Sequence, residues 1–192
     1  MILENSLQEN AAQNSSKKGN KSLSLNHSKL ISSFLWVLFA GNLLYLIYGF
    51  PTIPEWYYGN ILKINGFTIL IWTTVTFFSA LVSTYAGNYL NGFRHQSKFM
   101  ALCLGFTLSV MCFLMSNHVA LLLLNWFLMG FFMSRLIGIE SNWGEAREAS
   151  KFTQRYFLTG TLFLSAGVLL LAFYSGTFTV SGLISSLDNI PS

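Results

Sequence analysis

Five long runs of apolar residues, separated by short polar segments, dominate the chain from residue 31 onward. Each run approaches the length of a helix that crosses a bilayer, which needs about 20 predominantly apolar residues. The runs are Ile31–Phe50, about Phe67–Gly87, Phe99–Met115, Val119 to about Gly138, and Tyr156–Tyr174. The pattern predicts an all-α integral membrane protein with about five transmembrane helices.

The connections between the runs predict how these helices follow one another. Pro51 and Pro54 end the first run, because proline removes a backbone donor and disfavours a helical residue before it. Residues 55–65 mix aromatic side chains with apolar and polar alternation, which indicates an interfacial aromatic belt followed by a short strand or hairpin. The turn Ser116–His118 is very short, so the third and fourth helices should form an antiparallel pair. In this turn we expect His118 to be solvated.

Both ends of the chain differ from the membrane domain predicted over residues 30–174. Residues 1–29 are rich in Asn, Ser, Gln and Lys, and we expect a disordered tail there, since so little apolar surface cannot support a fold. A signal peptide is the alternative, but the first run is long and no small-x-small cleavage site follows it, so we expect a retained anchor helix. Residues 175–192 form a Gly- and Ser-rich tail with one amphipathic patch and no sixth span.

Composition supports an integral membrane protein, and it argues against a soluble globular domain and against a nucleic-acid-binding protein. Hydrophobic residues make up 53% of the chain and charged residues 9%, whereas about 25% charged residues is typical of soluble domains. The formal charge of +4 does not indicate a nucleic-acid partner, because the Lys and Arg residues are scattered between apolar runs. We therefore expect a multi-pass protein whose main partner is the lipid bilayer.

The distribution of Lys and Arg predicts the orientation, since cytoplasmic loops carry an excess of both. With the N-terminus in the cytoplasm, only Lys63 lies outside, so hairpin 55–65 and tail 175–192 would be extracytoplasmic. The other ten of the eleven basic residues then lie inside: Lys17, Lys18, Lys21, Lys29, Arg94, Lys98, Arg135, Arg147, Lys151 and Arg155. The prediction is N-in and C-out.

The connector before the fifth run contains the main candidate residues. Asn142, followed by Glu145, resembles a capping box, so we expect a helix that begins at Trp143 or Gly144 and runs into the fifth span. Arg147, Lys151 and Arg155 would then form a single stripe on that helix, at i, i+4 and i+8.

Two interpretations of this stripe remain open. It contacts anionic lipid headgroups, or Lys151 or Arg155 faces a protein partner or a proton path. Arg155 is the best candidate because it comes last before the membrane. Glu140 is a further candidate, being one of the few nearby acids together with Glu145 and Glu148.

Inside the predicted spans, polar chemistry is sparse. Asn42 and Asn125 are expected to make interhelical hydrogen bonds, and Cys103 and Cys112 are expected to pack as small apolar residues. No span contains Asp or Glu, the carboxylates often used by proton relays. Hydrolase, P-loop, dinucleotide and metalloprotease motifs are absent from the sequence, so no catalytic residue, metal site or cofactor is predicted.

Five short segments at the ends of the predicted spans form an ordered set: Ile64–Thr68, Ser83–Gly92, Lys98–Met100, Ser116–Trp126 and Lys151–Arg155. In this order they resemble the N-terminal part of the antiporter-like proton-translocating subunits. That family includes NADH dehydrogenase subunit 5, the Mrp antiporter large subunits, and the DabB subunit of the inorganic-carbon transporter. The resemblance covers about Asn60–Asp188, and it implies the same topology as the charges do.

Three departures from the family pattern bear on which branch of the family the chain resembles. Respiratory members carry Glu directly after the tryptophan, where this chain has Phe127 after Trp126. The family's Asp in the first motif is Asn65, and its Gly-Asp in the last motif is Phe157-Leu158. The missing Glu weakens the case for a proton-pumping role. In this respect the chain is more similar to the DabB branch, which also lacks that Glu. Family members also have many more spans, with a lysine relay in later helices.

The resemblance implies a truncated or split cation- or proton-translocating subunit of a bacterial inner membrane, and no enzyme by itself. Its expected partners are other membrane subunits of an antiporter-like or NADH:quinone oxidoreductase-like complex. The DabB branch also implies a soluble, zinc-binding DabA-like partner for uptake of CO2 and bicarbonate, with the zinc in that partner. A membrane scaffold that anchors partners through the basic stripe, and an inactive fragment, are the alternatives.

Overall fold

The structure is a computed structural model that describes residues 29–49, 55–90, 95–140 and 142–188. In these ranges, five helices are long and apolar enough to cross a membrane. They are the N-terminal helix Lys29–Gly49, α2 (Gly66–Tyr89), α3 (Gln96–Met115), α4 (Val119–Ile137) and α5 (Gly144–Ser175). The predicted all-α membrane fold with five long helices is therefore confirmed. The N-in orientation stays a prediction, and the tail expected to be disordered lies, apart from Lys29, outside the described residues.

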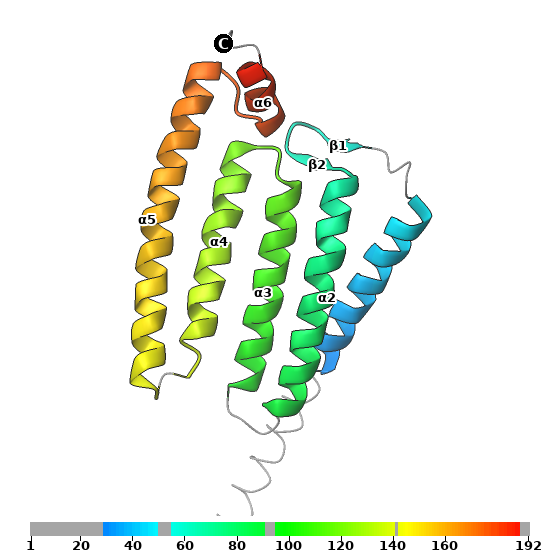
Figure 1. Ribbon diagram of the computed structural model, residues 1–192, viewed down its shortest axis with the longest axis vertical. Coiled ribbons are helices and arrows are strands. Elements are labelled where there is room, and N and C mark those ends of the chain that lie inside the picture. Colours follow the sequence, from blue (N-terminus) through cyan, green and yellow to red (C-terminus); the bar gives the residue numbers. More distant parts are fainter. Residues whose placement is uncertain (1–28, 50–54, 91–94, 141, 189–192) are drawn as a thin grey trace, which may run out of the picture.

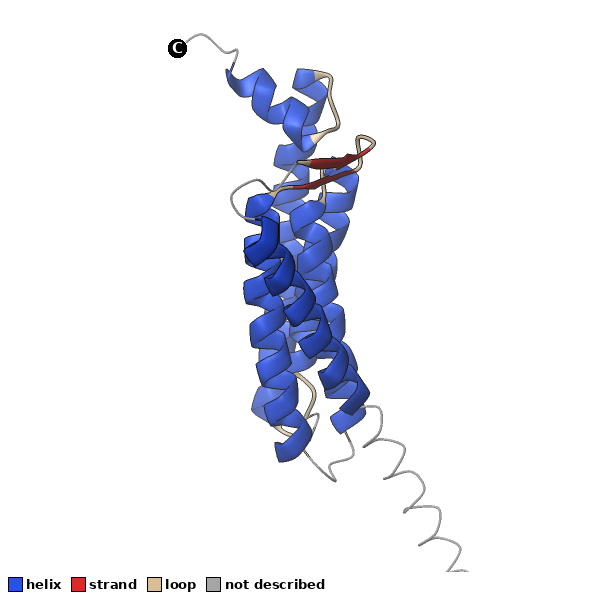
Figure 2. Ribbon diagram, turned by 90° about the vertical axis from the view of Figure 1, so that its right-hand side faces the viewer, coloured by secondary structure: helices blue, strands red, loops and turns tan. Residues whose placement is uncertain are grey.

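The helices stand side by side in sequence order, and each runs antiparallel to the one before it (Figure 1). Seen from the side, the row is narrow (Figure 2). A row leaves its two end helices covered on one side only. Accordingly, only 6% of the most apolar 18-residue stretch is buried in the N-terminal helix, and 6% in α5. The corresponding share in α2 is 33%. The two ends of the row thus present large apolar surfaces.

Polar side chains form several hydrogen bonds between neighbouring helices. Ser79 of α2 and Thr107 of α3 share a hydrogen bond of 2.6 Å between their hydroxyls. The indole N–H of Trp72 donates to the carbonyl of Met111, 3.1 Å away on α3. Small residues and interhelical hydrogen bonds are typical of membrane helix interfaces, because lipid provides no hydrophobic force between apolar helices.

A cap of short elements covers one end of the row. Strands β1 (Trp56–Tyr58) and β2 (Leu62–Ile64) form an antiparallel hairpin, with Tyr57 opposite Lys63. The turn between the strands places Gly59 at φ +58°, a conformation that favours glycine. The hairpin agrees with one of the two forms expected for residues 55–65. The short helix α6 (Val180–Asp188) lies beside it and was not predicted.

Helix α5 begins at Gly144, one of the two predicted positions, and continues without a break for 32 residues. The predicted cap was wrong, because the N-cap residue is Trp143 and it makes no side-chain capping hydrogen bond. The N–H of Trp143 instead donates to the carbonyl of Glu140 at 3.2 Å, which closes the turn before the helix. The basic connector and the fifth span are therefore one helix.

Candidate functional site: the basic end of the helix row

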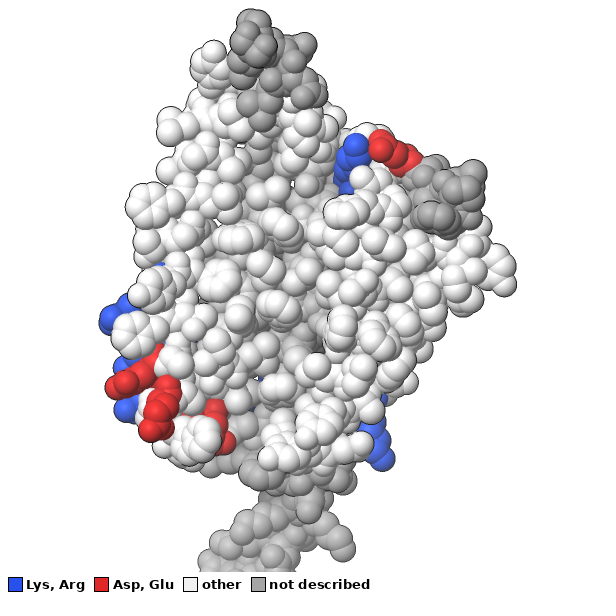
Figure 3. Space-filling view, in the orientation of Figure 1, with Lys and Arg blue, Asp and Glu red and all other residues white. Residues whose placement is uncertain are grey.

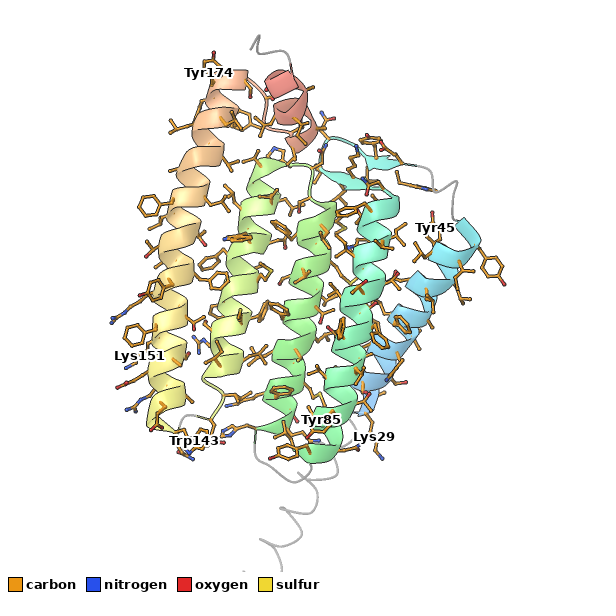
Figure 4. All side chains as sticks on the ribbon, in the orientation of Figure 1. Lys29, Tyr45, Tyr85, Trp143, Lys151 and Tyr174 are labelled. Atoms are coloured by element: carbon orange, nitrogen blue, oxygen red, sulfur yellow. The ribbon has the colours of Figure 1, made fainter. Side chains whose placement is uncertain are left out.

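Basic residues gather away from the hairpin. Of the described Lys and Arg residues, Lys63 alone lies in the hairpin, where its Nζ is 3.3 Å from Glu55. Figure 3 shows most of the other visible cations and several carboxylates around the start of α5, at the opposite end of the row. Figure 4 places Lys29 and Lys151 in that same half. One half of the membrane domain thus carries a concentrated positive charge.

Arg147, Lys151 and Arg155 lie on α5, the last helix of the row, and all three side chains are exposed. Lys151 points away from the other helices (Figure 4). A shallow hollow of about 220 Å³ is lined by Lys151, Arg155, Glu148 and Phe152. Phe152 is 55% exposed, so the stripe combines charge with an aromatic surface. Such a surface suits the membrane interface, where long cationic side chains reach towards headgroups.

Glu140 is not brought into this stripe. It is half-buried in the connector between α4 and α5. Among the described residues, the only ion pair within 4 Å is the one in the hairpin, so Glu140 pairs with none of Arg147, Lys151 and Arg155. Glu140 therefore does not neutralise the positive charge of the stripe through an ion pair.

The two candidate asparagines have different surroundings. Asn125 is 5% exposed on α4, and its Nδ2 donates to the Leu121 carbonyl at 2.9 Å and to the Ser116 hydroxyl at 3.3 Å. Ser116 caps the C-terminus of α3, so this second bond joins two helices. The Nδ2 of Asn42 is buried and has no hydrogen-bond partner in the part of the chain that the structure describes.

Helix α4 packs tightly against both neighbours through aromatic residues. The Trp126 ring lies 5.7 Å from that of Phe113 on α3 and 6.3 Å from that of Phe157 on α5. Phe157 also covers Gly130, where a Cβ atom would come within 2.7 Å of the Phe157 Cγ. These contacts fix α3, α4 and α5 relative to one another. Within the described ranges, no group of three or more His, Cys, Asp or Glu side chains could hold a metal ion.

One feature of the basic end of the helix row was not predicted from the sequence. A cavity of about 580 Å³ lies between the start of α3 and the end of α4, and His95, Lys98 and Arg135 line it. Lys98 and Arg135 entered the sequence analysis as orientation signals alone. Because α3 and α4 are antiparallel, the first turn of one helix lies beside the last turn of the other, and this pairing brings the two cations together.

Comparison with known proteins adds one similarity. No family model matches the chain. Over 145 residues, which are 76% of this chain, the sequence is 26% identical to a probable K(+)/H(+) antiporter subunit of Rhizobium meliloti (strain 1021). The match covers 14% of that protein, so the chain spans about one seventh of its length. The similarity supports an antiporter-like membrane family in general and does not single out NADH dehydrogenase subunit 5 or DabB.

Proposed function

We propose that this chain forms part of a cation- or proton-translocating membrane subunit of the antiporter type. The observation that carries the proposal is the similarity to a K(+)/H(+) antiporter subunit over three quarters of the chain. The five membrane-length helices are consistent with it. The translocated ion and the translocating residues are not assigned to this chain, since its described spans contain no acidic residue in their apolar parts.

Within this class, a DabB-like role in uptake of bicarbonate or CO2 is the finer proposal. It is supported by Phe127, which follows Trp126 where the respiratory members resembled by this chain carry Glu. Phe127 is 42% exposed, on the α4 surface next to α5. A zinc-binding soluble partner would belong to this role, and the zinc would be held by that partner.

Other membrane subunits are the expected partners, and the outer face of α5 is where we expect them. Phe163 and Leu170 on this helix are 75% and 71% exposed. An alanine Cβ placed at Gly160 or Gly167 would meet nothing within 4 Å, so a neighbouring helix has room to approach closely there. In a complex these surfaces would be covered by protein, and in an isolated chain by lipid.

A site-specific crosslink tests this proposal. A photoreactive amino acid is placed at Leu170 in the tagged chain, crosslinked in its own host membranes, and the products are identified by mass spectrometry after purification in mild detergent. We expect a stoichiometric adduct with an antiporter-type membrane subunit. The same probe at Ala172, which is fully buried against the row, is the control and should give no adduct with another protein. Adducts with lipid alone at Leu170 would contradict the proposal.

A membrane scaffold is the second candidate, and the exposure of the basic stripe favours it. Arg147, Lys151 and Arg155 contact no other described helix through an ion pair, which leaves them accessible to an acidic partner. Charge reversal of all three to Glu should then abolish partner recovery, whereas Arg155→Ala alone should change it little. For a proton path through Arg155, the single Arg155→Ala change should be sufficient to abolish transport.

A further inference from the structure

The cavity between α3 and α4 has two kinds of wall. The side chains of His95, Lys98 and Arg135 line one part. The other part is apolar and contains Ala101, Leu102 and Phe131, and Gly138 and Ile139 at the end of α4 complete the lining. At about 580 Å³, it has the size of a typical small-molecule pocket.

The basic part of the cavity lacks a compensating charge. Lys98 lies in the first turn of α3, where the helix dipole is positive and a cation is unfavourable. That turn contains no acidic residue, and its N-cap residue, His95, makes no side-chain capping hydrogen bond. In the described ranges, neither Lys98 nor Arg135 has a carboxylate within 4 Å. An anion between them would satisfy both cations and would also face the positive end of α3.

Arg135 is held in place on the opposite wall. Its guanidinium lies 5.1 Å from the centre of the Phe131 ring, one helical turn away on α4. It also lies in the last turn of α4, where a cation is favourable. The carbonyl of Ser134 in that turn already accepts bonds from the Gly138 N–H and the Ser150 hydroxyl. Arg135 is therefore not needed to cap the helix and is available to a ligand.

The order of the residues along the two helices indicates an amphipathic ligand. Lys98 and Arg135 lie at the end of the row, and Leu102 and Phe131 lie one turn further into the membrane span on their own helices. A free inorganic anion would use the outer, basic part only. A phospholipid would place its phosphate between the cations and its glycerol and first acyl carbons against the apolar wall.

We propose that this cavity binds the phosphate group of an anionic phospholipid, with Lys98 and Arg135 as the phosphate ligands. The proposal is independent of the proposed transport function. In the predicted orientation the site faces the cytoplasmic leaflet, where anionic lipids attract basic residues. A bound lipid would join the start of α3 to the end of α4.

Native mass spectrometry of the purified full chain tests the site, by titration with phosphatidylglycerol and, separately, with phosphatidylcholine. We expect one phosphatidylglycerol to bind more tightly than any phosphatidylcholine. The double variant Lys98→Gln/Arg135→Gln should weaken that binding about 30-fold, since each cation near an anionic headgroup contributes on the order of a fivefold factor. The matched control Lys29→Gln/Lys63→Gln removes the same charge at two residues that line neither this cavity nor the α5 stripe, and it should change the binding less than about threefold.

Two further variants distinguish specific lipid binding in the cavity from non-specific electrostatic attraction of the lipid and from misfolding of the protein. Leu102→Trp keeps every charge and fills the apolar wall, so it should also release the lipid. Lys98→Arg keeps the charge and should retain binding, which shows that the altered helix end still folds. Equal losses of phosphatidylglycerol binding in the two double variants would overturn the proposal. Displacement of the lipid by inorganic phosphate, at a phosphate concentration below that of phosphatidylglycerol, would overturn it as well.

Discussion

The buried side chain of Asn117 accepts a hydrogen bond from the backbone N–H of Ser181, 3.1 Å away. Asn117 belongs to the turn between α3 and α4, and Ser181 to the first turn of α6. The Asn117 carbonyl also accepts from the Val180 N–H at 2.7 Å, and its own N–H donates to the Ile61 carbonyl at 2.8 Å. One turn residue thus joins the hairpin, the α3–α4 connection and α6 into a single cap.

Replacing Asn117 with Ala should loosen the attachment of α6 to the cap. The Ser181 N–H, which is partly buried, would lose its acceptor, and leaving such a donor unpaired costs at most about 1 to 3 kcal/mol. We expect faster hydrogen exchange at the amides of residues 180–186, measured by mass spectrometry in detergent micelles, with the five long helices unchanged. The backbone bonds of residue 117 to Ile61 and Val180 do not depend on its side chain and should persist, whereas the 3.5 Å bond from its Nδ2 to the Asn60 carbonyl of the hairpin would be lost.

Asn88→Ala is the matched control for this change. Asn88 is exposed on α2, at the far end of the row from the cap. Its replacement should leave the exchange of α6 as it is in the parent chain. Unchanged exchange in Asn117→Ala as well would mean that the backbone bonds alone hold α6.

The close approach of α4 and α5 at Gly130 gives a second prediction. In Gly130→Ala, the new Cβ would come within 2.7 Å of the Phe157 Cγ, which is too near the backbone to swing away. Overpacking of this kind costs about 1 to 3 kcal/mol. A lower unfolding midpoint in a denaturing-detergent titration, followed by circular dichroism, is the expected result.

A compensating change tests whether Phe157 is the cause. Phe157→Ala alone should destabilise the pair by removing its packing on Trp126 and Gly130, but adding it to Gly130→Ala should cost less than the sum of the two single changes. Gly160→Ala, on the open face of α5, should be neutral or slightly stabilising. Strict additivity of Gly130→Ala and Phe157→Ala would contradict the contact.

The long helices were predictable because a membrane imposes a strong, local constraint. A helix is the only structure that satisfies the backbone of a single apolar segment in lipid, so run length is enough to identify it. The start of α5 was also predictable to within one residue. Its cap was not, because the N-cap position falls on Trp143, one residue after Asn142, and the Trp143 side chain makes no capping hydrogen bond.

The features that sequence reasoning missed depend on contacts between distant segments. Helix α6 is only 9 residues long and depends on Asn117 for part of its anchoring, 64 positions before Ser181. The pairing of Lys98 with Arg135 across a cavity follows from the antiparallel packing of α3 and α4. That packing was predicted, so counting turns from the Ser116–His118 connection to each cation could have found the pair.

The hairpin gives a prediction on pH. The Tyr57 hydroxyl donates to the Glu55 carboxylate at 2.6 Å, and together with Lys63 it holds the pKa of Glu55 below its ordinary value. A lowered pKa means that the carboxylate stabilises the folded hairpin above its unfolded-state pKa, and that this contribution is lost as the pH falls through the folded-state value. Tyr57→Phe should therefore raise the Glu55 pKa towards its ordinary value in a ¹³C NMR titration of the carboxyl group.

Tyr58→Phe is the control for this titration, since the Tyr58 hydroxyl has no hydrogen bond to any described residue and its ring is 76% exposed. It should leave the Glu55 pKa unchanged. Lys63→Gln should also raise the Glu55 pKa, because it removes both the hydrogen bond and the positive charge that the Lys63 ammonium supplies. An equal effect of the two tyrosine changes would show that the hydrogen bond is not formed in solution.

The two membrane asparagines should respond oppositely to replacement by leucine. Asn125→Leu removes the bond to the Ser116 hydroxyl, and interhelical bonds of this kind contribute about 0.6 kcal/mol on average and rarely more than about 1.7. Asn42→Leu removes an amide whose buried nitrogen has no partner among the described residues, so it should leave the isolated chain equally stable or more stable. Denaturing-detergent titration of both variants measures the difference.

The same Asn42→Leu variant also shows whether the Asn42 amide has a partner outside this chain. If the variant destabilises the chain in its native membrane while leaving it unchanged in detergent, the amide binds a partner, since the membrane then supplies a bond that detergent does not. Destabilisation in detergent as well would mean that the amide is already satisfied within the chain.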